Sequence, residues 1–104
     1  MRNPAAALKA IKNAVKAQAW RADPHLWKQL SKRGLQLVDV LEAIRKATRI
    51  RPHDMQPLNA GGESWRVYGY DLEKRYLGAG VELVEDGGGH FVVIITAFIQ
   101  EGSR

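Results

Sequence analysis

Residues 65–99 read WRVYGYDLEKRYLGAGVELVEDGGGHFVVIITAFI, and this stretch decides the fold class. It contains three runs in which apolar and polar residues alternate or β-branched and aromatic residues dominate, as in β-strands. These runs are 65–70, 76–84 and 90–99. The breaks between them, at 71–75 and 85–89, are short enough for hairpin turns. We therefore predict an antiparallel β-meander of three strands, or of four if residues 49–51 add a short one.

The residues before this stretch have the spacing of amphipathic helices. Three helices are predicted, at 5–19, 24–33 and 37–47. Their apolar faces comprise Leu8, Ile11 and Val15; Leu26, Trp27 and Leu30; and Leu37, Val40, Leu41 and Ile44. Asp23 and Pro24 are typical of a helix start and Gly34 of a helix end. Helices followed by a meander predict a single α+β domain, residues 1–104, with the N-terminal helices packed on one face of the sheet.

Successive strand residues point to opposite faces of a sheet, so odd- and even-numbered positions are predicted to line different faces. Odd positions are nearly all apolar and are expected to face the helices: Trp65, Val67, Leu77, Ala79, Val81, Leu83, Phe91, Val93, Ile95 and Ile99. On the even face, simple hairpin register predicts two rows, one of Tyr68, Gly78 and Thr96, the other of Arg66, Gly80 and Ile94. The two glycines would then leave a shallow trough flanked by Arg66, Tyr68 and Thr96. The alternative is that the glycines mark a bulge or tight packing against another element.

Composition excludes several classes of protein. The chain of 104 residues has no cysteine, so it offers no disulfide, thiolate zinc ligand or thiol nucleophile. No apolar run reaches the ~18 residues of a membrane span, and the first 15 residues do not resemble a secretory signal. A cytoplasmic protein is therefore expected. The three histidines, at positions 25, 53 and 90, match no metal-binding motif, so neither a metal nor another cofactor is expected.

Positive charge is concentrated in the first half of the chain. Residues 1–52 carry twelve Lys/Arg against three Asp/Glu, whereas residues 53–104 carry four against eight. Lys9, Lys12 and Lys16 recur at helical spacing and would form a basic ridge beside the apolar face of the first helix. Clustered cations point to nucleic acid or another polyanion as partner. A solvated helix surface would show the same pattern, because lysine is a good helix former.

His25 is the preferred candidate for acid–base chemistry. It falls in the first turn of the second predicted helix, where the helix dipole favours the neutral imidazole that a general base requires. The alternative is a surface histidine beside a helix cap. His53 follows a proline in a polar loop and is expected to be solvated, and His90 belongs to a turn. On the even face, Tyr68 beside Arg66 is a combination that can stack a base and hold a phosphate.

Two parts of the sequence resemble the small RelE-like families. PHLWKQLSKRGL at 24–35 and VDVLEAI at 38–44 resemble their opening, with a histidine, a helix ending in Arg-Gly-Leu and a second helix with spaced Val and Ile. WRVYG at 65–69, VEL at 81–83 and VIITA at 93–97 are similar to their strands. The resemblance covers residues 24–99 and leaves 5–19 as an extra N-terminal helix.

This resemblance implies the α+β ribonuclease fold of barnase, EndoU, colicin nucleases and RelE. It also implies metal-independent RNA cleavage, often by a toxin that is paired with an antitoxin. By position, His25 would be the acid–base group, Arg66 would contact the scissile phosphate, and Thr96 would be a hydrogen-bonding residue on the last strand. Arg33 would be a basic or structural residue at the end of its helix.

The expected function is therefore that of a toxin-like endoribonuclease. In this reaction the ribose 2′-OH attacks the adjacent phosphate, a base takes its proton, and cations stabilise the charge that develops. The residues expected to bind RNA are Lys9, Lys12, Lys16, Arg33 and Tyr68. The alternative is a non-catalytic module of the same fold that binds nucleic acid or a partner protein.

Overall fold

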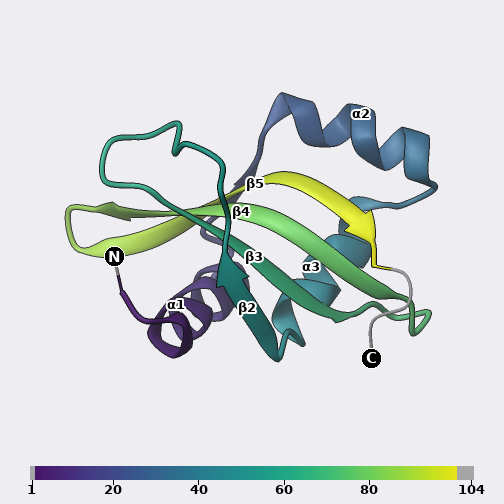
Figure 1. The fold of residues 1–104 in the computed structure, drawn as a ribbon, viewed down its shortest axis with the longest axis horizontal. Helices are drawn as coiled ribbons and strands as arrows, with labels where there is room; N and C mark the ends of the chain where they lie inside the picture. Colours follow the sequence, from purple (N-terminus) through teal and green to yellow (C-terminus); the bar gives the residue numbers. More distant parts are fainter. Residues whose placement is uncertain (1, 101–104) are drawn as a thin grey trace.

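The computed structural model describes residues 2–100, which form three helices and a mixed sheet of five strands (Figure 1). The helices are α1 (Pro4–Lys16), α2 (Pro24–Arg33) and α3 (Leu37–Arg45). The strands are β1 (Trp20–Ala22), β2 (Arg49–Pro52), β3 (Glu63–Tyr70), β4 (Tyr76–Asp86) and β5 (Gly89–Ile99), in the order β1-β5-β4-β3-β2. The predicted α+β class is confirmed. No helix among the described residues is long and apolar enough to cross a membrane.

The helices begin and end where local sequence provides caps. The Asn3 side chain accepts the N–H of Ala6 at 2.8 Å, and the Asp23 side chain accepts the N–H of His25 at 2.9 Å. A proline follows each of these caps as the first helical residue. Gly34 ends α2 in the left-handed conformation, with φ at 65°. These local signals explain why the predicted start and end of α2 agree with the structure.

The sheet contains one strand that the sequence did not predict. The first helix ends at Lys16, three residues before its predicted end, and Gln18 follows with a positive φ of 63°. The chain then forms β1, which pairs in parallel with β5 over three residues, Trp20 lying opposite Val92. The prediction of a purely antiparallel sheet is therefore wrong at this edge, whereas the short strand expected at 49–51 exists as β2.

The prediction that all three helices pack on one face of the sheet is wrong for α2. α1 and α3 lie together against one face, with Ile11 and Ile44 buried in the main core (Figure 1). α2 instead runs along β5 where β1 has ended, and Arg33 donates there to the backbone oxygen of Ala97. Because β1 is short, it leaves this part of the β5 edge uncovered, and α2 takes its place. Trp27, predicted on the buried face of α2, is 53% exposed as a result.

Because of a bulge in β5, the rows of residues across the sheet differ from the predicted ones. β3 pairs with β4 as predicted, but in the next hairpin Gly80 lies opposite Thr96 while Val81 lies opposite Ile94. Ile95 is thus an extra residue in β5. The rows are therefore Arg66, Gly80 and Thr96 in one, and Tyr68, Gly78 and Phe98 in the other.

The same bulge reverses the parity of the first half of β5. Val92 and Ile94 lie in the main core under the helices. Val93 and Ile95 pack on the other face, in a small cluster with Val84, Met55 and Phe91. The predicted core face is therefore correct for β3 and β4 but wrong for Phe91, Val93 and Ile95. The reason is that residues 91–95 are all apolar, so their pattern does not distinguish the two faces.

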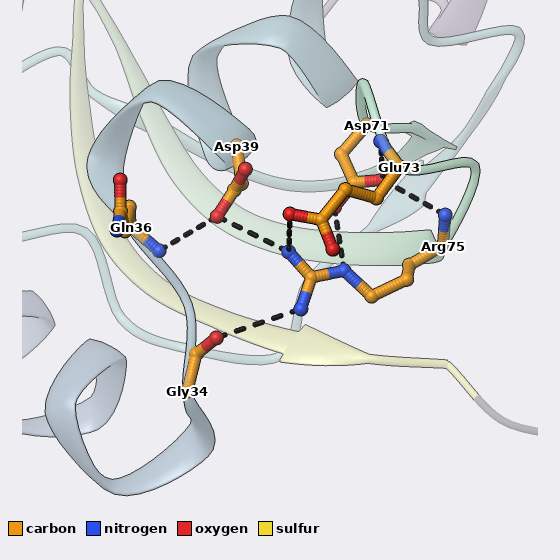
Figure 2. Close-up of polar contacts among 6 residues, drawn as sticks. All are labelled: Gly34, Gln36, Asp39, Asp71, Glu73 and Arg75. Carbon is orange, nitrogen blue, oxygen red and sulfur yellow. Dashed lines mark hydrogen bonds and ion pairs between the residues drawn. The ribbon is translucent and has the colours of Figure 1, made fainter.

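Arg75 ties the β3–β4 turn to the junction of α2 and α3 (Figure 2). Buried Asp71 accepts the backbone N–H groups of Glu73 and Arg75 at 2.9 and 2.8 Å and pairs with Nε of Arg75 at 2.8 Å. On the other side of the guanidinium, Nη2 lies 3.2 Å from Oδ2 of Asp39, which caps α3. Nη1 donates to the backbone oxygen of Gly34 at 3.5 Å. One side chain thus connects three segments of the chain.

The close approach of α3 to β3 depends on Gly69. A Cβ at this position would overlap the backbone oxygen of Ala43 and come within 3.0 Å of Ala47 Cα. Gly69→Ala should therefore lower the free energy of unfolding by roughly 1–3 kcal/mol. Gly89→Ala is the matched control, because no atom lies within 4 Å of its Cβ position. Urea denaturation of both variants checks the prediction, and equal losses would contradict it.

Candidate functional site

The face of the sheet opposite α1 and α3 gathers three arginines. Across β2 and β3, Arg49 lies opposite Tyr68 and Arg51 opposite Arg66. Side chains of directly opposed residues share a face, so all three guanidinium groups lie on this side. We call it the arginine face; its residues are Arg49, Arg51, Arg66, Tyr68, Gly78, Gly80, Thr96 and Phe98.

Aromatic rings lie beside these cations. The guanidinium carbons of Arg49 and Arg51 are each 5.9 Å from the centroid of the Tyr68 ring. Tyr68 is buried and stacks on Tyr76, with the ring centroids 6.0 Å apart. Tyr70, next along β3, is 45% exposed. Cations over buried rings, with one exposed ring nearby, are features that bind phosphates and stack bases in single-stranded nucleic acids.

Gly78 and Gly80 allow side chains from both neighbouring strands to pack down onto β4. A Cβ at Gly80 would lie 3.2 Å from Nε2 of His53 and closer still to the Thr96 methyl group. At Gly78 it would overlap the ring of Phe98. The glycines therefore do not leave the predicted open trough. The alternative interpretation, tight packing against other elements, is correct for both glycines.

His53 is the histidine that contacts the arginine face. Its backbone N–H donates to the Ser64 oxygen at 3.1 Å and so extends the pairing of β2 with β3 by one residue. Its ring Nδ1 lies 3.4 Å from Nη2 of Arg66. Burial, and then the charge of Arg66, lower the pKa of His53 below its ordinary value of 6.5, while Asp54 opposes the shift. The lowered pKa favours the neutral ring, in which Nδ1 accepts from Arg66, because a guanidinium can only donate.

Arg66 retains unused hydrogen-bonding capacity. Its guanidinium carbon lies 5.7 Å from the centroid of the Phe98 ring, and its Nη2 faces His53. Its Nε is buried, and no hydrogen-bond partner for it exists among residues 2–100. Buried polar atoms without a partner are rare in folded proteins. Arg66 therefore keeps one donor without a partner at the centre of this face.

Thr96 is held in place by α2. Its hydroxyl donates to Oε1 of Gln29, and Nη1 of Arg33 donates to the same oxygen at 3.2 Å. Arg33 also donates to the backbone of Ala97, so its guanidinium links α2 to β5. These contacts give Arg33 a structural role; RNA binding by Arg33 stays a prediction. Thr96 and Arg66 lie in the same row, on either side of Gly80.

His25 lies at the start of α2, and its convergence with Arg66 and Thr96 stays a prediction. The side chain is exposed at the start of α2, one helical turn before Gln29, and its backbone N–H is capped by Asp23. Within the described part of the chain, no hydrogen bond or ion pair connects its ring to Arg66 or Thr96. Its role as acid–base group therefore stays a prediction. His53, by contrast, was expected to be solvated and is in fact in contact with Arg66.

The predicted basic ridge lies on the opposite side of the sheet. α1 covers one face of the sheet (Figure 1), whereas Arg66 belongs to the arginine face on the other side. Lys12 donates to the backbone oxygen of Ala47 at 2.9 Å and so caps the end of α3. Lys9 and Lys16 are exposed on this side. The predicted RNA-binding residues therefore lie in three places: the lysines on α1, Arg33 on α2 and Tyr68 on the arginine face.

Sequence reasoning missed His53, Gln29 and the two arginines of β2. A usable signal was present in residues 49–53, RIRPH, where Arg49, Arg51 and His53 alternate as on one face of a strand. No comparable signal exists for Gln29, because its contact with Thr96 depends on where α2 lies.

Comparisons with models of known protein families and with curated proteins find no match to this sequence. Among residues 2–100, no three His, Asp or Glu side chains are grouped so that they could hold a metal ion. The function must therefore be inferred from the side chains of the arginine face.

Proposed function

We propose that this protein is a metal-independent endoribonuclease of the RelE-like type and that it cleaves RNA on the arginine face. The observation that carries the proposal is the contact between His53 and Arg66. It places a neutral imidazole acceptor 3.4 Å from a guanidinium whose Nε has no partner in the described chain. A base beside a phosphate-binding cation is what attack by a ribose 2′-OH requires. The resemblance of residues 24–35 and 65–69 to RelE-like families supports the same reaction.

Each group then has a defined part in the reaction. The scissile phosphate accepts hydrogen bonds from the guanidinium group of Arg66. Once Nη2 of Arg66 turns from Nδ1 of His53 to the phosphate, the ribose on the 5′ side of that phosphate presents its 2′-OH to Nδ1, which takes the proton as the oxygen attacks phosphorus. The bond from phosphorus to the 5′-oxygen breaks, and that oxygen takes a proton from water. The products are a 2′,3′-cyclic phosphate and a 5′-hydroxyl. The part of Thr96 in the reaction stays a prediction, because its hydroxyl donates to Gln29.

Cleavage chemistry gives a direct test. An RNA oligonucleotide should be cut by the purified protein in the presence of EDTA, leaving 2′,3′-cyclic phosphate ends. The same sequence made as DNA should stay intact, because it lacks the attacking hydroxyl. Binding of RNA without any cleavage would overturn the proposal and favour the alternative, a non-catalytic nucleic-acid-binding module.

The resemblance also suggests a biological setting, which we include in the proposal. A ribonuclease toxin acts on cytoplasmic RNA and is neutralised by a partner antitoxin. Expression of this chain should then arrest growth, and co-expression of the neighbouring gene should restore it. Normal growth at high yield of the folded protein would contradict the toxin role.

The pKa of His53 should depend on Arg66. Because the charge of Arg66 lowers this pKa, Arg66→Met should raise it toward the ordinary value of 6.5. Asp54 raises the pKa, so Asp54→Asn should lower it further. Titration of the ring protons by NMR measures both shifts. As the reacting base must be neutral, the cleavage rate of the parent protein should rise with pH through a midpoint below 6.5 and be level at neutral pH.

If the pKa of His53 is unchanged in both variants, the contact with Arg66 does not exist in solution. If the cleavage rate falls rather than rises as the ring loses its proton, His53 is not the base.

The salt dependence of RNA affinity should distinguish the two basic surfaces. Each phosphate contact with single-stranded RNA contributes about 0.7 to the slope of log K against log salt concentration. Arg49→Gln with Arg51→Gln should therefore lower the slope by up to about 1.4. Lys9→Gln with Lys16→Gln, a matched double variant on α1, should keep the parent slope. A slope that falls only in the lysine variant would place the RNA on α1.

A further inference from the structure

A cleft of about 370 Å³ opens directly beside His53, between β3 and the loop that joins β2 to β3. Small-ligand sites have volumes of about 300–1,000 Å³, so the cleft has room for one small ring system. The wall residues that matter here are His53, Met55, Pro57, Gly61, Gly62 and Ser64.

Buried Glu82 fixes the loop that forms this cleft. Its carboxylate, fully buried on β4, accepts the backbone N–H groups of Leu58 and Asn59 at 2.9 and 2.8 Å. The Asn59 side-chain amide adds a third donor at 3.1 Å. Gly62 passes so close to the carboxylate that a Cβ there would collide with it. A loop held by one buried acceptor in this way is pre-organised, so the cleft exists before any ligand binds.

The cleft has the chemistry of a site for a flat heteroaromatic ring. His53, Met55 and Pro57 are the less exposed residues of an alternating stretch, so the loop turns an apolar side toward the sheet. Beneath it, Oγ of Ser64 is buried and has no hydrogen-bond partner among the described residues. Buried hydroxyls normally find a partner. Apolar walls with one unpaired hydroxyl suit a nucleobase, which has apolar faces and hydrogen-bonding edges.

We propose that this cleft binds the base of the nucleotide whose 2′-OH attacks the phosphate, and that Ser64 hydrogen-bonds the edge of that base. This inference rests on the proposed function, because His53 belongs to both sites. Its Nδ1 faces Arg66, where the scissile phosphate would bind, and His53 also forms part of the cleft wall. A ribose whose 2′-OH lies at Nδ1 carries its base one sugar ring away, on the side of the cleft. The enzyme therefore prefers particular bases immediately 5′ of the bond that it cuts.

The four nucleoside 3′-monophosphates and inorganic phosphate test this subsite without requiring cleavage. At least one nucleotide should bind the full-length protein about tenfold or more tightly than phosphate, measured by titration calorimetry. In NMR spectra this nucleotide should shift the amides of residues 55–64 as well as the His53 ring. Ser64→Ala should weaken its binding about five- to tenfold and leave phosphate binding unchanged. Ser31→Ala, at an exposed position on α2, is the matched control and should change neither.

The outcomes separate the subsite from the proposed function. If phosphate shifts the His53 ring but no nucleotide binds more tightly or affects residues 55–64, the base subsite is wrong and the phosphate site stands. If neither phosphate nor nucleotide affects His53, both proposals are overturned.

Discussion

Replacing His53 with alanine should lower the rate of RNA cleavage by a factor of about 10²–10⁴ and leave the affinity for RNA within about twofold of the parent. A neutral imidazole that accepts a proton acts mainly in the transition state, so its removal lowers kcat much more than it weakens binding. Single-turnover cleavage and equilibrium binding of the same oligonucleotide measure the two effects separately.

Two further variants serve as comparisons for His53→Ala. His25→Ala removes the residue that the resemblance assigns to catalysis. Because His25 is exposed and has no contact with Arg66, this variant should cleave RNA at the parent rate. Arg66→Ala should damage both rate and affinity, because a cation on the phosphate acts in the ground state and the transition state. Loss of cleavage in His25→Ala with full activity in His53→Ala would show that the assignment by resemblance is correct and that His53 is not the base.

Replacing Arg75 with methionine should destabilise the folded protein by about 3 kcal/mol. Methionine keeps much of the side-chain length but leaves the Asp71 carboxylate, whose side chain is 0% exposed, without its cation. Removing one partner of a buried ion pair is costly because the remaining charge stays out of water. The loss should be larger than for a surface pair, since the guanidinium also connects Asp39 and Gly34 to the turn.

Lys74→Met provides the control for Arg75→Met. Lys74 lies in the same turn and is exposed, so its replacement should change the free energy of unfolding by less than about 0.5 kcal/mol. Guanidinium denaturation of both variants makes the comparison. A loss for Arg75→Met no greater than for Lys74→Met would show that the network of Figure 2 does not stabilise the fold.

Sequence predicted the parts of the fold that depend on neighbouring residues. The cap at Asp23, the end of α2 at Gly34 and the pairing of β3 with β4 all follow from local turn and cap chemistry. β1 could not be predicted, because three residues carry too little pattern and their partner lies about seventy residues away in β5. The bulge at Ile95 was hidden for a related reason, since an apolar run is compatible with either face.

The candidate site was predicted only in part, for the same physical reasons. Arg66, Tyr68 and Thr96 were found because strand parity alone places them on one face. His53 was missed because Pro52 suggested the beginning of a loop, whereas the chain continues the strand geometry for one more residue. The lysines of α1 were grouped with Arg66 because the sequence does not show on which side of the sheet a charged side chain lies.

Binding of RNA on the arginine face beside His53 can be mapped by NMR. A short RNA with 2′-O-methyl groups cannot be cleaved by the proposed reaction, so it forms a stable complex with the parent protein. The largest shift changes are expected at the His53 ring, the Arg66 side chain, and the amides of Tyr68 and Thr96, with little change along Pro4–Lys16. Shift changes confined to Lys9, Lys16 and their neighbours on α1, with the His53 ring unaffected, would contradict binding on the arginine face.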